Sequence, residues 1–219
     1  MECKVLVQEG KKAFERMECE RMKMLRQQIQ GEETFLFLPM FEQNVHKNVE
    51  DFRVELFSRL EQDISAIAEI FFAGEMPARI SDITWDGADF HAHGRCALKI
   101  ETDCGVFYYK PRISDMDALY CQIVRTWFSD ITDVPQCLFR DGYSYVAEIR
   151  ETGVESEQEV GEAYFHYGAL LALFQALGSS DMHCENLIMR GTFPVVVDME
   201  TMLTPPRILL MQKGFSTVC

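Results

Sequence analysis

The order of apolar and polar positions predicts helices at the start of the chain. Between residues 48 and 72, apolar side chains recur every three or four positions, which predicts a helix with one buried stripe. The stripe consists of Phe52, Leu56, Phe57, Leu60, Ile64, Ile67 and Phe71. A thinner stripe between residues 11 and 30 predicts an exposed helix or the truncated edge of a larger structure, with apolar positions at Phe14, Met17, Met24 and Leu25.

Strict alternation then replaces the helical spacing. Cys96, Leu98 and Ile100 alternate with polar residues, a turn follows at residues 103–105, and residues 106–110 return, which predicts a β-hairpin. Pro111 ends this pairing because it lacks an N–H donor. Ser114 suits the cap of a following helix. The apolar positions of that helix are Met116, Leu119, Tyr120, Ile123, Val124 and Trp127.

The last third of the chain predicts a strand, a long helix and a second hairpin. The strand covers residues 144–149, and Ser156 with Glu159 forms a capping box that opens the longest helix, which Gly178 ends. The apolar stripe of that helix is expected at Val160, Tyr164, Tyr167, Leu171, Phe174 and Leu177. An apolar segment at residues 187–189, a turn at Gly191 and a strand at residues 193–198 follow.

This order of elements indicates an α+β fold and not the regular alternation of a doubly wound sheet. We expect one continuous fragment with three regions. These are a helical segment at residues 1–75, a strand-rich lobe at residues 76–150, and a helix with functional loops at residues 151–219.

The amino-acid composition of the chain limits the classes of function that it can have. The chain has 219 residues, is 47% hydrophobic and has a formal charge of −14, so it can build a core and repels nucleic-acid phosphates. It contains no apolar run long enough for a membrane span and no secretory signal at its start. Its eight cysteines show no C-x-x-C spacing, which favours reduced thiols and a cytoplasmic location.

Three polar residues near the second hairpin point to phosphoryl transfer. Asp181 is followed five positions later by Asn186, and Asp198 follows twelve positions after that at the end of a β-branched strand. One carboxylate would orient the acceptor hydroxyl, while an amide and a second carboxylate would hold Mg²⁺ against the phosphates. Lys110 ends a strand 71 positions before Asp181 and is the candidate phosphate ligand. The same residues also fit a plainer interpretation, in which they cap loops and begin a turn.

Longer motifs resemble those of the dehydratase domain of class II lanthipeptide synthetases (the LanM type). These are the aromatic-K-P-R strand at residues 109–112, the segment 167–172, the D-x-H-x-E-N loop at residues 181–186 and the P-V-x-x-D-x-E-T strand at residues 194–201. The D-x-H-x-x-G-R segment at residues 89–95 also matches, so the resemblance runs from about residue 60 to residue 203.

The resemblance implies a fold similar to lipid kinases and an enzyme that phosphorylates Ser and Thr of a leader-bearing precursor peptide with ATP and Mg²⁺. The phosphate is then eliminated to leave dehydroamino acids. By the same resemblance, Lys110 binds the ATP phosphates, Asp181 acts on the acceptor hydroxyl with His183 beside it, and Asn186 and Asp198 hold the metal.

The resemblance also assigns residues that spacing alone does not. Glu200 is implied as a further active-site acid, and Asp89 and His91 match positions used in phosphate elimination. Family synthetases are several-fold longer and end in a zinc-binding cyclase, and the downstream arginine and threonine of the elimination site are absent from this sequence. A truncated reading frame, a split gene or a deliberate fragment would explain this difference. With a split gene, a separate chain would carry the missing dehydratase and cyclase parts.

Other interpretations of single residues stay open. Arg112 could bind phosphate or pair with Asp115, and His91 with His93 could be structural or, with Asp89, ligate zinc. Lys99 competes with Lys110 as the phosphate ligand, although its place on the polar face of a strand favours solvent exposure.

Two further function classes also stay open. One is a kinase that modifies the hydroxyl of a small molecule such as an antibiotic, and the other is an inactive fragment that binds a peptide or a partner subunit.

Overall fold

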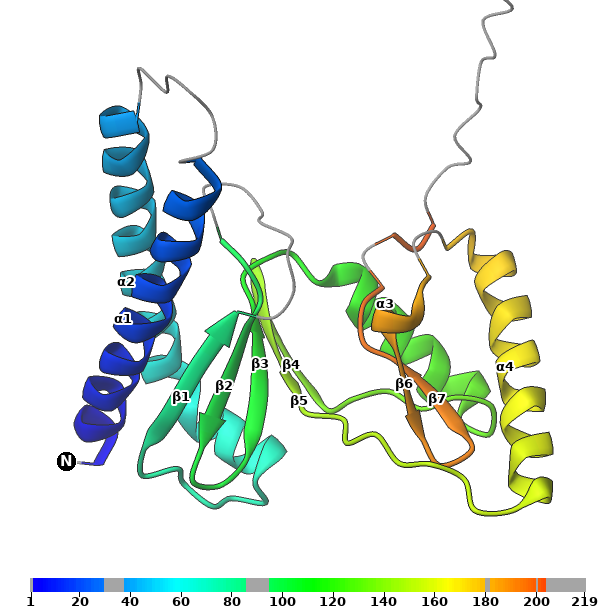
Figure 1. Cartoon of the computed structure of the whole chain (residues 1–219). Helices are drawn as coiled ribbons and strands as arrows, with labels where there is room; N and C mark the ends of the chain where they lie inside the picture. Colours follow the sequence, from blue (N-terminus) through cyan, green and yellow to red (C-terminus); the bar gives the residue numbers. More distant parts are fainter. Residues whose placement is uncertain (1, 30–37, 86–94, 180–181, 200, 204–219) are drawn as a thin grey trace, which may run out of the picture. The chain divides into compact units, whose positions relative to one another are not determined.

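The structure is a computed structural model that describes residues 2–29, 38–85, 95–179, 182–199 and 201–203 (Figure 1). The chain divides into two compact units. Unit 1 contains residues 1–115 and 135–149, and unit 2 contains residues 116–134 and 150–219. The described parts are a mixture of helices and antiparallel strands, which confirms the predicted α+β class.

Unit 1 packs two helices against an antiparallel sheet. The helices are α1 (Glu2–Ile29) and α2 (Leu38–Phe71). The five strands lie in the order β1-β2-β3-β5-β4. Their bounds are Ile80–Trp85 for β1, Leu98–Thr102 for β2, Val106–Lys110 for β3, Cys137–Arg140 for β4 and Tyr143–Ala147 for β5.

The core of unit 1 confirms the predicted stripe of α2 and corrects the prediction for α1. The α2 stripe is buried except for Phe71, which is half-buried. The N-terminal helix was expected to be exposed, but Leu6, Phe14 and Met17 are buried in the same cluster. The reason is that α1 covers β1, so its thin apolar stripe has a partner within the chain.

The predicted hairpin is β2–β3, and its turn is closely packed. Thr102 donates through its hydroxyl to the carbonyl of Gly105, and that hydroxyl accepts from the Gly105 N–H. Gly105 has a φ of +154°, and a Cβ on it would lie 2.9 Å from the ring of Phe72. A side chain at this position would therefore force Phe72 out of its contact with the hairpin.

The sequence did not predict β1. Its register on β2 shifts between Ile80 and Asp82, which marks a β-bulge. The bulge lets Ile80 and Ile83 both face the core, three positions apart. Because of this spacing, a search of the sequence for strictly alternating apolar residues does not find β1.

Unit 2 consists of helices around a second hairpin. Helix α3 (Asp115–Ile123) continues as a π-helical turn at Val124–Phe128, and α4 spans Glu157–Leu177. A 3-10 turn at Cys184–Asn186 leads into β6 (Leu187–Arg190), which pairs antiparallel with β7 (Phe193–Val196). The predicted second hairpin is thus confirmed, with β7 ending two residues earlier than expected.

Both ends of α4 follow the predicted capping. The Ser156 hydroxyl accepts from the Glu159 N–H, the Glu159 carboxylate accepts from the Ser156 N–H, and Gly178 is left-handed with a φ of 60°. Of the predicted buried stripe, Phe174 is buried and Leu177 is half-buried, but the other four residues are not buried. Val160, Tyr164, Tyr167 and Leu171 are exposed. The buried residues of α4 are Ala163, Leu170, Leu173 and Phe174.

The α3 stripe is buried in part. Tyr120 and Val124 are buried, whereas Leu119 and Trp127 are exposed. Among the described residues, the length and apolar character of each helix fall short of what a membrane crossing requires.

The capping box makes the start of α4 sensitive to pH. The Glu159 carboxylate accepts from the backbone N–H groups of Glu155 and Ser156, and these bonds hold its pKa below the ordinary 4.5. A pKa depressed in the folded state means that this contribution to stability is present above pH 4.5 and is lost as pH falls through the folded value. We expect Glu159→Gln to lower the urea midpoint at pH 7 and the difference from wild type to shrink below pH 4.5.

Glu157→Gln is the matched control, because it removes a charge from the same helical turn. A deficit of Glu159→Gln that stays constant down to pH 3 (a test pH well below the ordinary pKa of about 4) would contradict the assignment of the bonds to the charged carboxylate.

Candidate functional site

Lys110 lies on the face of the sheet opposite the core of unit 1. It follows Tyr109, whose side chain is fully buried in that core, and successive side chains of a strand point to opposite faces. Its cross-strand partner is Ser144 of β5. The predicted phosphate ligand therefore stands at the end of β3, on the face that α1 and α2 do not cover.

Lys99 lies on the same face of the sheet as Lys110. Lys99 pairs across the strands with Tyr108, which is two residues from Lys110 on β3. The Lys99 ammonium lies 2.8 Å from a carboxylate oxygen of Glu101, and a hydrogen bond to Glu101 raises the pKa of Lys99. The Lys99 ammonium is therefore already paired with a carboxylate on its own strand.

The chain after β3 is fixed by two buried hydroxyl groups. Ser114 Oγ lies 2.8 Å from Ser144 Oγ and 3.2 Å from the carbonyl oxygen of Arg112. Arg112 itself donates from Nη1 to the carbonyl of Ile113. These bonds connect the residues that follow Lys110 to the strand that pairs with it.

Glu55 of α2 joins several groups that sequence analysis did not associate. Its carboxylate pairs with the guanidinium groups of Arg59 and Arg95, and the Tyr109 hydroxyl lies 3.4 Å from Oε1. Burial raises the pKa of Tyr109, so its hydroxyl stays protonated and can donate to the carboxylate. Glu55 thus anchors β3 next to Lys110, and it also anchors Arg95, the last residue of the D-x-H-x-x-G-R motif.

A second acid on the same helix makes a similar connection. Asp63 is buried and accepts from Arg140 Nε at 2.7 Å and from the Tyr143 hydroxyl at 2.8 Å. Arg59 lies between the two acids, with its guanidinium 4.1 Å from the centre of the Tyr143 ring. Acids and a cation at intervals of four residues beside an apolar stripe are the signal that could have revealed this network.

In unit 2, the second hairpin brings two predicted metal ligands to one end. Asn186 immediately precedes β6, and Asp198 lies two residues beyond the end of β7. Leu187 pairs with Val196, and the Val197 N–H donates to the Asn186 carbonyl at 3.1 Å. Asn186 and Asp198 are separated by two strands in the sequence, but the hairpin brings their backbone positions close together.

His183 contacts Asn186 through side chain and backbone. The Asn186 amide nitrogen lies 3.4 Å from His183 Nε2, and the Asn186 N–H donates to the His183 carbonyl at 3.0 Å. In this arrangement the amide nitrogen of Asn186 faces the imidazole. The amide oxygen is then the Asn186 atom suited to a cation, and with the Asp198 carboxylate it offers the hard oxygen donors that Mg²⁺ prefers.

Asp117 is a residue of this site that the sequence did not predict. Its Oδ1 accepts from the Met199 N–H at 3.2 Å, 82 positions away, and so holds the backbone directly after Asp198. An acid in the first turn of a helix is common, because it suits the helix dipole, and this hides its role from sequence analysis.

Other segments of unit 2 contact both strands of the β6–β7 hairpin. On the side of β7, Asp133 bridges to Val195 and the Thr132 hydroxyl donates to the Pro194 carbonyl at 2.6 Å. On the side of β6, Thr152 bridges to Arg190, which forms an ion pair with Asp133. From α4, His166 stacks on Phe193 with ring centroids 4.6 Å apart. These contacts connect both strands of the hairpin to other segments of unit 2.

Four predicted site residues lie outside the described part of the chain. They are Asp89, His91, Asp181 and Glu200. His93, considered as a zinc ligand, is also outside it. Within the described residues, three or more His, Cys, Asp or Glu side chains do not gather at any one point as a metal site would require.

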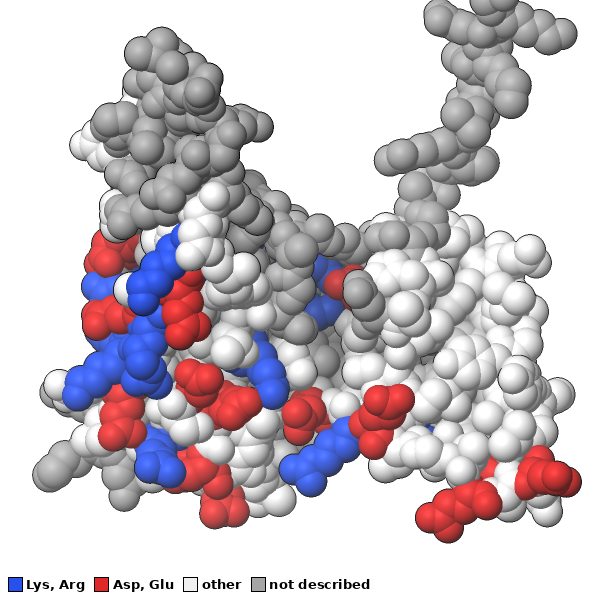
Figure 2. Space-filling view, viewed as in Figure 1, with Lys and Arg blue, Asp and Glu red and all other residues white. Residues whose placement is uncertain are grey.

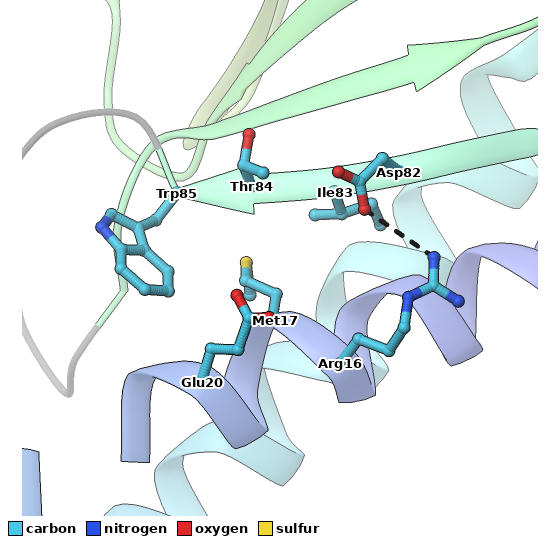
Figure 3. Close-up of a pocket in the computed structure, with 7 residues that line it drawn as sticks. All are labelled: Arg16, Met17, Glu20, Asp82, Ile83, Thr84 and Trp85. Carbon is cyan, nitrogen blue, oxygen red and sulfur yellow. Dashed lines mark ion pairs between the residues drawn. The ribbon is translucent and has the colours of Figure 1, made fainter. Parts of the chain in front are cut away.

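A pocket of about 520 Å³ lies elsewhere, between α1 and the edge strand β1 (Figure 3). Arg16 of α1 lies 3.7 Å from Asp82 of β1 within it, and Glu20 and Trp85 form other parts of the wall. β2 separates this edge strand from β3, which bears Lys110. The pocket is therefore distinct from the predicted phosphate-binding strand.

Comparison with known proteins supports the motif analysis. The family described as "Domain of unknown function (DUF4135)" matches residues 38–217, which is most of the chain. The chain belongs to the DUF4135 family. DUF4135 is found in LanM-type lanthipeptide synthetases, which confirms the resemblance that the motifs indicated.

A relative agrees with the DUF4135 assignment. Over 140 residues the chain is 25% identical to the "Lacticin 481/lactococcin biosynthesis protein LcnDR2" of Lactococcus lactis subsp. lactis. The match covers 58% of this chain and only 15% of that relative. The chain thus corresponds to a small part of a much longer protein, and at family level it is assigned to lanthipeptide biosynthesis.

The Glu55 network generates a prediction about stability. Replacing Glu55 by Ala leaves two largely enclosed guanidinium groups and the Tyr109 hydroxyl without their shared acceptor. We expect a loss of about 2 kcal/mol in the free energy of unfolding, measured by urea denaturation. Glu61→Ala is the control, because Glu61 is an exposed acid on the same helix. Equal stabilities of the two variants would contradict a central role for Glu55.

Proposed function

We propose that this chain is the ATP-binding, kinase-like part of a lanthipeptide dehydratase. It would transfer phosphate from ATP to Ser and Thr side chains of a leader-bearing precursor peptide. The observation that supports this most directly is the common position of Asn186 and Asp198 at one end of the β6–β7 hairpin, with His183 against Asn186. An amide and a carboxylate are the residue types that protein kinases use for magnesium.

Each residue has a stated task in the proposed transfer. The Lys110 ammonium holds ATP phosphate oxygens, and the Asp181 carboxylate orients the acceptor hydroxyl and takes its proton. The hydroxyl oxygen bonds to the γ-phosphorus while the bond from that phosphorus to the ADP oxygen breaks. Mg²⁺, when bound by Asn186 and Asp198, would neutralise charge on the phosphates.

Elimination is the second half of the proposal. The bond between Cβ and the phosphate oxygen breaks as the Cα proton leaves, which yields a dehydroamino acid and inorganic phosphate. Asp89 and His91 are proposed for this step, and Glu200 as a further acid of the site. Membership of the DUF4135 family supports both halves, since that family occurs in LanM-type synthetases.

Phosphoryl transfer is tested with the full chain, Mg-ATP and a leader-bearing, Ser/Thr-rich peptide encoded beside its reading frame. We expect mass spectrometry to detect phosphopeptide with the wild-type chain. Asp181→Ala and Asp198→Asn should each lower the rate by about a hundredfold or more, because they remove the proton acceptor and a metal ligand.

Asp130→Asn is the control, since Asp130 is an exposed acid of the same unit. Transfer that survives both site substitutions would contradict these roles. Phosphorylation of an aminoglycoside or sugar but not of the peptide would favour the small-molecule kinase. Calorimetry that detects no Mg-ATP binding by the folded chain would favour a binding fragment.

The Asp117 contact generates a separate prediction. If Asp117 positions the backbone after Asp198, Asp117→Ala should raise the Mg²⁺ concentration needed for half-maximal ATP binding by about tenfold. Asp117→Asn keeps an oxygen acceptor for the Met199 N–H and should restore most of the affinity. An unchanged Mg²⁺ requirement in the Ala variant, or equal defects in both variants, would argue against a positioning role.

A further inference from the structure

The outer face of α4 is a continuous apolar stripe that the described part of the chain does not cover. It consists of Val160, Tyr164, Tyr167 and Leu171, and we refer to these four residues as the outer stripe. Tyr164 and Leu171 keep 75% and 63% of their surface exposed. The opposite face of α4 is buried, because β7 packs against this helix. A helix that is apolar all round is typical of a position inside a larger protein.

The spacing of the outer stripe suits a helix as its partner. Its members follow one another at intervals of four, three and four residues. This is the spacing of the apolar seam in packed helix pairs, where each side chain fits between residues of the facing helix. Helix α2 presents a stripe of similar spacing to a sheet, so the preference for a helix as the partner depends on the glycines beside the outer stripe.

Two glycines beside the outer stripe also favour a helix as its partner. Gly161 and Gly168 are seven residues apart and therefore lie on one side of the helix. A Cβ on either would meet no atom within 4 Å, so packing inside this chain does not require glycine at these positions. Glycine weakens a helix interior, so its presence there needs another reason. Close approach of a second backbone along this side is such a reason.

Charge is also absent from this part of the helix. The sequence contains no Lys, Arg, Asp or Glu from Ala163 to Ser180, although the chain as a whole is highly charged. On the face shown in Figure 2, acidic and basic side chains gather over α1 and the sheet, whereas the region of α4 is mostly uncharged. A solvated helix face would be expected to display charges, while the core of an interface is depleted of them.

We propose that the outer stripe of α4 packs against an apolar helix from further dehydratase polypeptide, of the kind that forms the rest of the longer relative. The segment that matches this chain covers 15% of the length of LcnDR2, so further sequence exists in that relative that could supply the helix. The inference depends on family membership and on the surface of α4, and it does not require phosphoryl transfer. Its binding test therefore stands apart from the test of activity.

The test mixes the full chain with LcnDR2 polypeptide from which the segment that aligns with this chain has been deleted. Sedimentation velocity should detect a one-to-one complex. Leu171→Glu should weaken the complex by more than about tenfold, since it places a charge in an apolar interface. Val54→Glu is the matched control, because Val54 is 60% exposed on a helix of unit 1, and it should leave binding unchanged.

Gly168→Leu separates binding from folding. It should raise the melting temperature of the isolated chain, because leucine is a better helix former than glycine, and at the same time weaken the complex by blocking close approach. Failure of the wild-type chain to bind, or equal binding by Leu171→Glu, would overturn the proposal. So would self-association of the chain alone that Leu171→Glu abolishes, because the occupant would then be a second copy.

Discussion

The charged contact between α2 and the sheet is the interaction on which the rest of unit 1 depends. Apolar packing holds a helix against a sheet without fixing its position along the strands, because the hydrophobic effect has no direction. Glu55, Arg59 and Asp63 fix the position of α2 along the strands. Each of these charged side chains needs a hydrogen-bonding or oppositely charged partner when it is removed from water. Glu55 contacts the Tyr109 hydroxyl, so Tyr109 points inward and Lys110 points to the opposite face of the sheet.

Local signals were sufficient for several elements of the fold. The capping box at Ser156, the left-handed Gly178 and both hairpins depend on residues that lie close together in sequence, and the structure contains them where they were predicted. Elements with unusual spacing or distant partners were not predictable in this way. The bulge in β1 breaks its alternation, and α1 appeared exposed because its partner strand begins about fifty residues beyond its end.

The same distinction applies to the candidate site. The motifs indicated that Asn186 and Asp198 act together, and the hairpin explains how residues separated by two strands reach one end. No local pattern could assign Asp117 to this site, since its contact with Met199 is made in the folded chain across most of unit 2. For α4 the sequence indicated the helix but four of the six residues expected in its buried stripe are not buried, because apolar residues occupy more than one side of the helix after Glu162.

The path of the chain between the two units limits how such a protein can be shortened. The backbone passes from one unit to the other after residues 115, 134 and 149. Strands β4 and β5 therefore belong to the sheet of unit 1 although they follow α3 of unit 2 in the sequence. A gene interrupted before residue 137 would encode a sheet without β4 and β5, and neither unit can be inherited or exchanged as one contiguous segment.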